Sequence, residues 1–224
     1  MITSIRGSAK RAPVVGEDFV AEQYYGLAHW IQTSGPAAGG TARTVGVTSP
    51  AAGAGVSTVA ASLAAAAAQQ SDRPVLLIDL SGSSLLSKVK TRVGDDELAP
   101  GETNKQSSAQ PEIAATTVPN LSRLSLGPTT GRPPYSGGSI EELIRDLDGE
   151  FGFIVVDLPP VESSACLAIA GILDWLLMVV EARRTASLSA TRGMQRLALA
   201  GARVLGVIFN RCSPDLPRWL DSRL

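Results

Sequence analysis

Residues 45–64, VGVTSPAAGAGVSTVAASLA, have the residue types and the spacing of a phosphate-binding loop. An apolar run leads into a turn with Gly53 and Gly55, and an alanine-rich stretch that favours a helix follows. Glycine permits a turn that points successive backbone N–H groups at an anion, and the helix N-terminus adds partial positive charge. The candidate nucleotide-binding residues of this loop are Gly53, Ala54, Gly55, Val56, Ser57 and Thr58.

Val56 stands where such a loop normally carries a lysine that reaches the β- and γ-phosphates. Losing a charge-assisted contact to phosphate costs about 1.5–3 kcal/mol. That loss corresponds to about one to two decades of affinity. Because the lysine also neutralises charge on the transferred phosphoryl group, we expect the rate of transfer to suffer more than binding.

Two aspartates follow apolar, strand-like runs: Asp79 ends VLLID and Asp157 ends FIVVD. In an open α/β sheet, the carboxyl ends of the strands meet at the ligand-binding edge. We therefore assign Asp79 and Asp157 as candidate catalytic residues, although each alone is also explained as a turn or helix-cap residue. If a nucleotide binds, the expected Mg²⁺ ligands are Ser57, Asp79 and Asp157.

The elements that must position these residues alternate between strands and helices. Several of the strands are almost continuously apolar, which is typical of strands covered by helices on both faces. The sequence therefore predicts an α/β fold with a doubly wound, mostly parallel sheet flanked by helices. The expected strands are 43–49, 74–79, 121–126, 151–157, 175–181 and 203–209, and the expected helices are 57–70, 139–147, 163–172 and 187–200.

The chain of 224 residues can bury one large core, and we expect a single P-loop NTPase-like domain over 17–212. It would begin with an amphipathic helix at 17–34 and contain a polar, variable loop at 94–110. A flexible arm at 1–16 would precede it, and a short tail at 213–224 would follow it. The net charge of −1 gives no basic field for a nucleic-acid partner. The sequence also lacks a signal peptide and a membrane span, which predicts a cytoplasmic protein.

Seven segments, in order and spacing, carry a family resemblance: VTSPAAGAGVSTVAASLA, PVLLIDLSGS, VPNLSRLSLGP, SIEELIRDL, FGFIVVDLPPV, LDWLLMVVEARRT and LGVIFNRC. Together they resemble the cytoplasmic domain of the bacterial tyrosine autokinases of capsule and exopolysaccharide synthesis, relatives of the MinD/ParA ATPases. The resemblance covers roughly residues 17–212. It implies the same fold, binding of ATP or ADP with Mg²⁺, and a role for Asn210 in reading the adenine edge.

The chain departs from this family at functional positions. Asp79 keeps the first acid of the family's Asp-x-Asp-x-Arg motif, but Ser81 and Ser83 replace the second acid and the arginine. On the N-terminal helix, Tyr25 and Ala28 stand where the family has the arginines that pair neighbouring subunits in a ring, so the oligomeric state stays open. The tail contains no tyrosine, whereas the family ends in a tyrosine-rich substrate segment.

These losses, together with Val56, favour a pseudokinase: a degenerate tyrosine-kinase-like protein with weak or no activity. The resemblance implies that it acts as a partner or regulator in exopolysaccharide or capsule biosynthesis and export. Its implied partners are a membrane-anchored polysaccharide chain-length regulator, or a related envelope protein, and an active kinase paralogue. The chain-length regulator would recruit it to the inner membrane. Nucleotide binding would be weakened or lost.

Two alternatives remain open at the level of sequence. The first is an active tyrosine kinase or ATPase whose lysine comes from a partner or from Lys88 or Lys90, with Arg183 and Arg184 as further charges near the nucleotide. The second is a MinD/ParA-like nucleotide switch in positioning. Such switches usually carry another lysine early in the loop, and residues 49–52 contain none.

Overall fold

The structure is a computed structural model that describes residues 22–33, 42–81, 113–126, 137–182 and 184–211. The expected arm 1–16, variable loop 94–110 and tail 213–224 lie outside these described residues, as do four side chains discussed above: Ser83, Lys88, Lys90 and Arg183.

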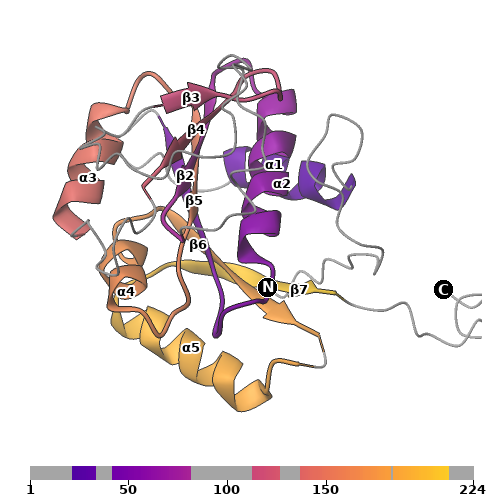
Figure 1. Ribbon diagram of the computed structural model, residues 1–224, viewed down its shortest axis with the longest axis vertical. Coiled ribbons are helices and arrows are strands. Elements are labelled where there is room, and N and C mark those ends of the chain that lie inside the picture. Colours follow the sequence, from indigo (N-terminus) through magenta and orange to yellow (C-terminus); the bar gives the residue numbers. More distant parts are fainter. Residues whose placement is uncertain (1–21, 34–41, 82–112, 127–136, 183, 212–224) are drawn as a thin grey trace, which may run out of the picture.

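One seven-stranded sheet, with the strand order β3-β4-β2-β5-β1-β6-β7, forms the centre of the described part of the chain (Figure 1). All neighbouring strands in it pair in parallel except β3 and β4, which are antiparallel. This sheet confirms the predicted mostly parallel α/β fold. The strands are β1 (Arg43–Thr48), β2 (Val75–Asp79), β3 (Ile113–Ala115), β4 (Leu121–Ser125), β5 (Phe153–Asp157), β6 (Trp175–Glu181) and β7 (Val204–Asn210).

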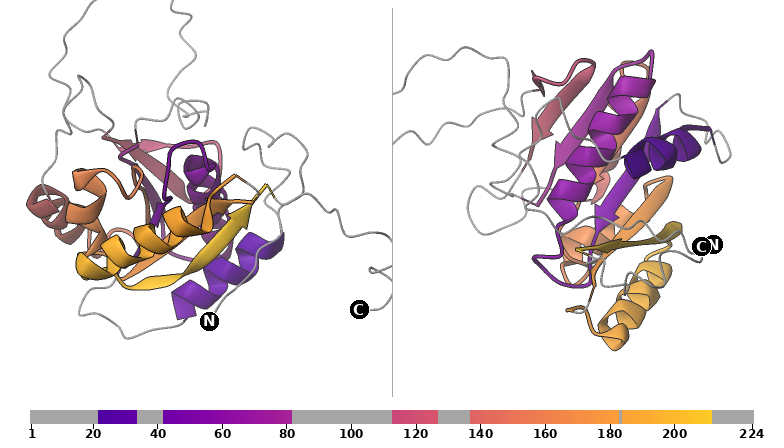
Figure 2. Two further views of the ribbon diagram at one scale, coloured as in Figure 1. Left: turned by 90° about the horizontal axis from the view of Figure 1, so that it is seen from below. Right: turned by 90° about the vertical axis from the view of Figure 1, so that its right-hand side faces the viewer.

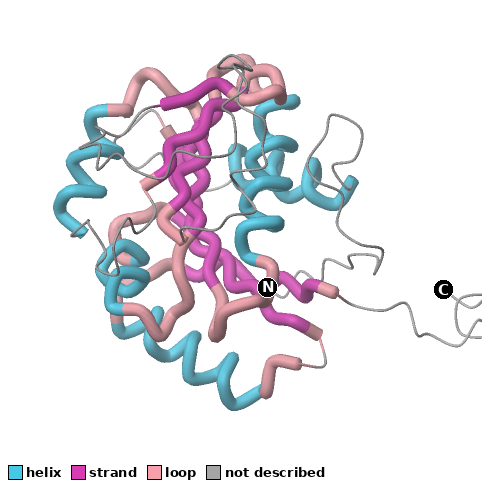
Figure 3. Tube along the Cα trace, viewed as in Figure 1, coloured by secondary structure: helices cyan, strands magenta, loops and turns pink. Residues whose placement is uncertain are grey.

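Helices cover both faces of the sheet, as Figures 1 and 3 show from the side and Figure 2 shows from two further directions. One face carries α2 (Val56–Gln70), against which α1 (Glu22–Thr33) packs. The other face carries α3 (Gly137–Asp146), α4 (Ser164–Ala170) and α5 (Ser187–Leu199). None of the helices in the described ranges combines the length and the apolar character that a membrane crossing requires.

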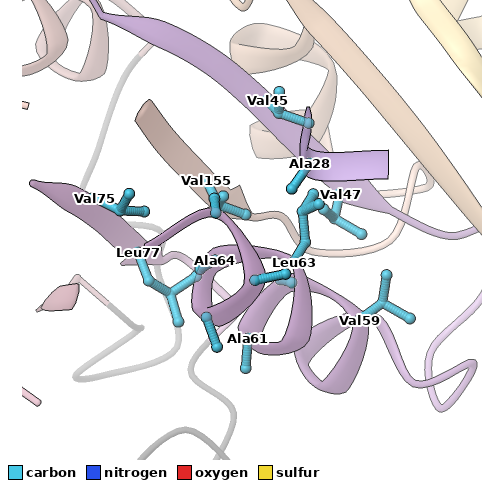
Figure 4. Packing of buried hydrophobic residues seen from close by; sticks show 14 of the residues in the cluster. Ala28, Val45, Val47, Val59, Ala61, Leu63, Ala64, Val75, Leu77 and Val155 are labelled. Atoms are coloured by element: carbon cyan, nitrogen blue, oxygen red, sulfur yellow. The ribbon is translucent and has the colours of Figure 1, made fainter. Parts of the chain in front are cut away.

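The continuous apolar runs of the strands are explained by two separate hydrophobic cores. Side chains alternate between the faces of a strand, so Val75 and Leu77 of β2 enter the core under α2, while Leu76 and Ile78 enter the core under α3, α4 and α5. Figure 4 shows the first core, in which β-strand valines meet small residues of α2 and Ala28 of α1.

The observed elements differ from the expected ones mainly at the sheet edge. β3 was not predicted, because it has only three residues, two of them exposed, and pairs with one neighbour, so it leaves no apolar run in the sequence. β7 includes Asn210, one residue beyond the expected strand end.

Candidate functional site

The loop between β1 and α2 has the backbone conformation that the glycines predicted. Gly53 and Gly55 have φ angles of 88° and 89°, in the left-handed region that side chains other than glycine rarely adopt. Gly55 is the N-cap of the 15-residue α2, and no side chain caps the helix there. The first N–H groups of a helix lack intrahelical partners, so this end of α2 fits an anion such as phosphate.

Asn210, at the end of β7, holds this loop. Its Nδ2 donates a hydrogen bond to the Ala54 carbonyl (2.9 Å), and its Oδ1 accepts one from the backbone N–H of Arg211 (2.9 Å). The φ angle of Gly55 favours glycine, and a Cβ atom there would collide with Nδ2 of Asn210 unless that side chain moved and gave up its contact with Ala54. The proposed contact of Asn210 with adenine stays a prediction.

The two predicted acids are adjacent. Asp79 and Asp157 are register partners on the paired strands β2 and β5, and their exposed fractions are 1% and 0%. Ser81 connects them: its hydroxyl lies 2.7 Å from Oδ2 of Asp157 and 3.1 Å from Oδ1 of Asp79, to which its backbone N–H also donates. Oδ1 of Asp157 is buried and accepts no hydrogen bond within the described residues. It is therefore positioned to accept one from a ligand or from water.

Arg123 of β4 is a site residue that the sequence reasoning missed. Its Nη2 lies 3.0 Å from Oδ2 of Asp79, and the exposed fraction of its side chain is only 11%. The available signal was an arginine between two apolar residues, Leu121 and Leu124, in the run LSRLS. A buried arginine requires an acidic partner.

Burial raises the pKa of Asp157 to about 6. The hydroxyls of Ser57 and Ser81 and the charge of Arg123 lower this pKa, whereas the neighbouring charge of Asp79 raises it further. Near neutral pH the carboxyl is therefore mostly ionised but close to its titration range. A carboxyl poised in this way can hold or release a proton under mild conditions.

The first turn of α2 brings the remaining predicted residues to the acids. Ser57 Oγ lies 3.4 Å from Ser81 Oγ, so the loop and the acid pair form one site. Val56, in the lysine position, is partly buried and packs against the core under α2, and Thr58 is partly buried beside it.

A small charged cluster lies beside the loop. Glu181 of β6 is the register partner of Asn210, and it binds Arg211 (3.0 Å) and Arg184 (3.5 Å). The single carboxylate of Glu181 thus faces two exposed guanidinium groups. These three described side chains together carry a formal charge of +1, which favours an anionic ligand.

The predicted Mg²⁺ ligands fit the ion unequally. Ser57 and the unpartnered oxygen of Asp157 would hold Mg²⁺, which would supply positive charge at the phosphates. Asp79 fits poorly, because its oxygens already accept from Ser81 and Arg123 and the guanidinium of Arg123 would repel the ion. Among the described residues, no group of three or more His, Cys, Asp or Glu could hold a metal ion.

A left-handed glycine loop before a helix, with buried aspartates at the ends of two neighbouring strands, is typical of P-loop NTPases, although the motif normally also carries a lysine. The family profile of ParA, described as "NUBPL iron-transfer P-loop NTPase", matches residues 40–217, well over half of the chain. The chain therefore belongs to the ParA family of P-loop NTPases. Among curated proteins, none matches the chain.

Solved structures show the same fold. The kinase domain of the Escherichia coli tyrosine kinase ETK is 20% identical, with a TM-score of 0.60 over 78% of this chain and 69% of its own. The VpsO kinase domain is 23% identical, with a TM-score of 0.62 over 85% and 91%. The septum site-determining protein MinD of Pyrococcus horikoshii, complexed with Mg-ADP, is 19% identical, with a TM-score of 0.53 over 78% and 74%.

Proposed function

We propose that this protein binds an adenine nucleotide at the loop after β1 but transfers phosphate weakly or not at all. We further propose that it acts as a partner or regulator in exopolysaccharide or capsule biosynthesis. One observation carries the proposal: the loop keeps both left-handed glycines and an uncapped helix end, while Val56 occupies the lysine position.

The backbone supports binding without the lysine. Phosphate is held in such loops chiefly by N–H groups at the helix N-terminus, and the hydrogen bond from Asn210 to the Ala54 carbonyl helps to fix the loop. MinD, which shares the fold, was solved with Mg-ADP. Transfer of a phosphoryl group depends more on the missing positive charge than binding does.

The proposed partner is the cytoplasmic part of a membrane-anchored chain-length regulator, with an active kinase paralogue as a second partner. Solved tyrosine kinase domains with this fold support a kinase-related role. The two residues at the family's ring positions contact α2 of the same chain: Ala28 is buried against it, and the Tyr25 hydroxyl donates to Gln69. This supports a role other than ring assembly and leaves the oligomeric state open. The protein would lie in the cytoplasm and reach the membrane through its partner.

Calorimetric titration with ADP and ATP tests the binding. We expect micromolar to millimolar binding by the wild type and at least a tenfold loss in Gly55→Ala, whose Cβ collides with Asn210. The matched control is Gly149→Ala, which has a similar positive φ of 100° and lies away from the loop, in the turn before β5. Absence of heat at millimolar nucleotide, or equal losses in both variants, contradicts the proposal.

Activity and partnership are tested separately. Purified protein incubated with labelled ATP should show little transfer to itself or to a tyrosine kinase substrate. Transfer that disappears in Asp157→Asn would instead support the active-kinase alternative. Co-purification with a chain-length regulator from a strain producing both proteins would support the partner role, and an unchanged polymer length on deletion would contradict it.

A further inference from the structure

The acid pair of Asp79 and Asp157 has a positively charged neighbour within the protein, Arg123. Asp79 and Asp157 would place two negative charges side by side in the interior, at exposed fractions of 1% and 0%. Buried like charges are costly unless an opposite charge compensates them. Arg123 supplies that charge from the neighbouring strand β4, with Nη2 at 3.0 Å from Oδ2 of Asp79.

We propose that Arg123 is a built-in counter-ion that takes, at Asp79, the place of a divalent cation. The acid pair then needs no metal for stability. Without Asp79, Mg²⁺ would keep only Ser57 and Asp157 as side-chain ligands, so we expect it to add little to the nucleotide affinity of the loop. The second consequence rests on the proposed nucleotide binding, whereas the first concerns the acid pair alone.

The geometry favours a permanent pairing over an occasional contact. The Arg123 side chain is largely buried, at an exposed fraction of 11%, so the guanidinium has left most of its water and gains compensation from the buried carboxylate of Asp79. Ser81 binds the other oxygen of Asp79 with its backbone N–H. An incoming metal ion would have to compete with these donors, and the buried positive charge of Arg123 beside the same carboxylate would repel a divalent cation.

Ser81 contributes a neutral hydroxyl to the acid pair. Its hydroxyl lies between the two acids, at 2.7 Å from Asp157 and 3.1 Å from Asp79. A serine at this position carries no charge, so the pair and Arg123 together have a formal charge of −1 when both carboxyls are ionised. A third carboxylate at this position would raise the demand for a cation beyond what one arginine can meet.

Metal binding without nucleotide gives the first test. Mn²⁺ binding, followed by the electron paramagnetic resonance signal of the free ion, is compared in the wild type, Arg123→Met and Arg145→Met. Arg145 is the matched control, because it pairs with Glu141 on α3 at the same 3.0 Å distance but is 66% exposed. We expect Arg123→Met to bind Mn²⁺ at least tenfold more tightly than the wild type, and Arg145→Met to equal the wild type.

Equal Mn²⁺ affinity in the wild type and Arg123→Met overturns the proposal. Arg123→Lys, which keeps the charge, should retain the weak binding of the wild type. If Arg123→Met does not fold in the absence of metal, recovery of its native circular dichroism on adding Mn²⁺ supports the proposal, and failure to recover with Mn²⁺ counts against it.

The second test uses ADP with Mg²⁺ and with a chelator. We expect less than a threefold change in wild-type affinity and more than a tenfold gain from Mg²⁺ in Arg123→Met. A tenfold or larger gain from Mg²⁺ in the wild type overturns the proposal. If the wild type binds no ADP under either condition, the proposed function fails, while the Mn²⁺ comparison still decides the role of Arg123.

Discussion

Val56 limits how strongly the loop can bind the β- and γ-phosphates of a nucleotide. Its side chain is apolar and packs against the core under α2, so the loop offers phosphate only backbone N–H groups and the nearby hydroxyls. The neighbouring Ser57 keeps its place beside Ser81. Within the described loop, Val56 is therefore the residue that departs from the usual phosphate contacts.

Introducing the lysine should restore much of the missing affinity. We expect Val56→Lys to bind ADP about ten- to a hundredfold more tightly, because one charge-assisted contact contributes about 1.5–3 kcal/mol. Calorimetry measures the change, and Val56→Met, which adds length without charge, serves as the control. An equal effect of both substitutions would show that the charge is not what the loop lacks.

Asp157 should make stability depend on pH. Its pKa is raised to about 6 in the folded state, so the folded protein binds more protons than the unfolded chain between about pH 4 and 6. The contribution of Asp157 therefore favours folding at low pH and is lost as pH rises through 6, by about 3 kcal/mol.

Urea unfolding at several pH values checks this sign. The free energy of unfolding of Asp157→Asn, relative to the wild type, should rise between pH 4 and 7 and then level off. Taking the difference between the two proteins removes the titration of groups that they share. A difference that does not vary with pH would mean that burial does not raise the pKa of Asp157.

The loop, β7 and the start of α2 form one unit, because the Asn210 amide lies against the backbone of Ala54 and Gly55. Gly55→Ala suffers from both the collision and the positive φ, whereas Asn210→Ala loses only the hydrogen bond. Removing the amide should relieve the collision but not the backbone strain. We expect the double variant to be less destabilised than the sum of the single variants, by about 0.5–3 kcal/mol.

Thermal or urea unfolding of the four proteins in this cycle gives the coupling energy. Gly53→Ala provides the matched comparison, since Gly53 has a φ of 88° but no atom within 4 Å of its ideal Cβ position. Its cost should be independent of Asn210. Strict additivity for Gly55 and Asn210 would contradict the described contact.

The sequence was sufficient for elements with continuous apolar runs and insufficient where residues act across strands. β2 and β5 are visible in VLLID and FIVVD, because both of their faces are buried. The pairing of Arg123 with Asp79 depends on β4 lying beside β2, a neighbour relation that the order of residues does not contain. Ser81 was interpreted only as a lost acid, and its position between two carboxylates required the three-dimensional arrangement.

Across the whole molecule, the cores on the two faces of the sheet differ in how they are covered. On one face, α3, α4 and α5 pack on the sheet as a single layer. On the other face, α2 packs on the sheet and α1 packs against α2 (Figure 2). Ile31 and Ala28 of α1 are fully buried in this contact. The outer helix is therefore part of the core rather than an appendage.

Ile31→Ala should consequently destabilise the entire fold. We expect a loss of about 2–5 kcal/mol, typical of removing a buried isoleucine side chain. Leu199→Ala is the control, because that leucine is 89% exposed and should change stability by less than about 0.5 kcal/mol. Urea unfolding followed by tryptophan fluorescence and by circular dichroism should give one shared transition. An early, separate transition of Trp30 would show that α1 unfolds independently.

The buried alanines of α2 determine how a displacement crosses this half of the molecule. Residues from Ala64 to Ala68 are at most 4% exposed. A methyl group has no alternative rotamer, so a shift of the helix cannot be absorbed by rearranged side chains in a close-packed interior. We therefore expect a displacement imposed at Gly55 to move α2 largely as one unit and to reach α1, which packs against it.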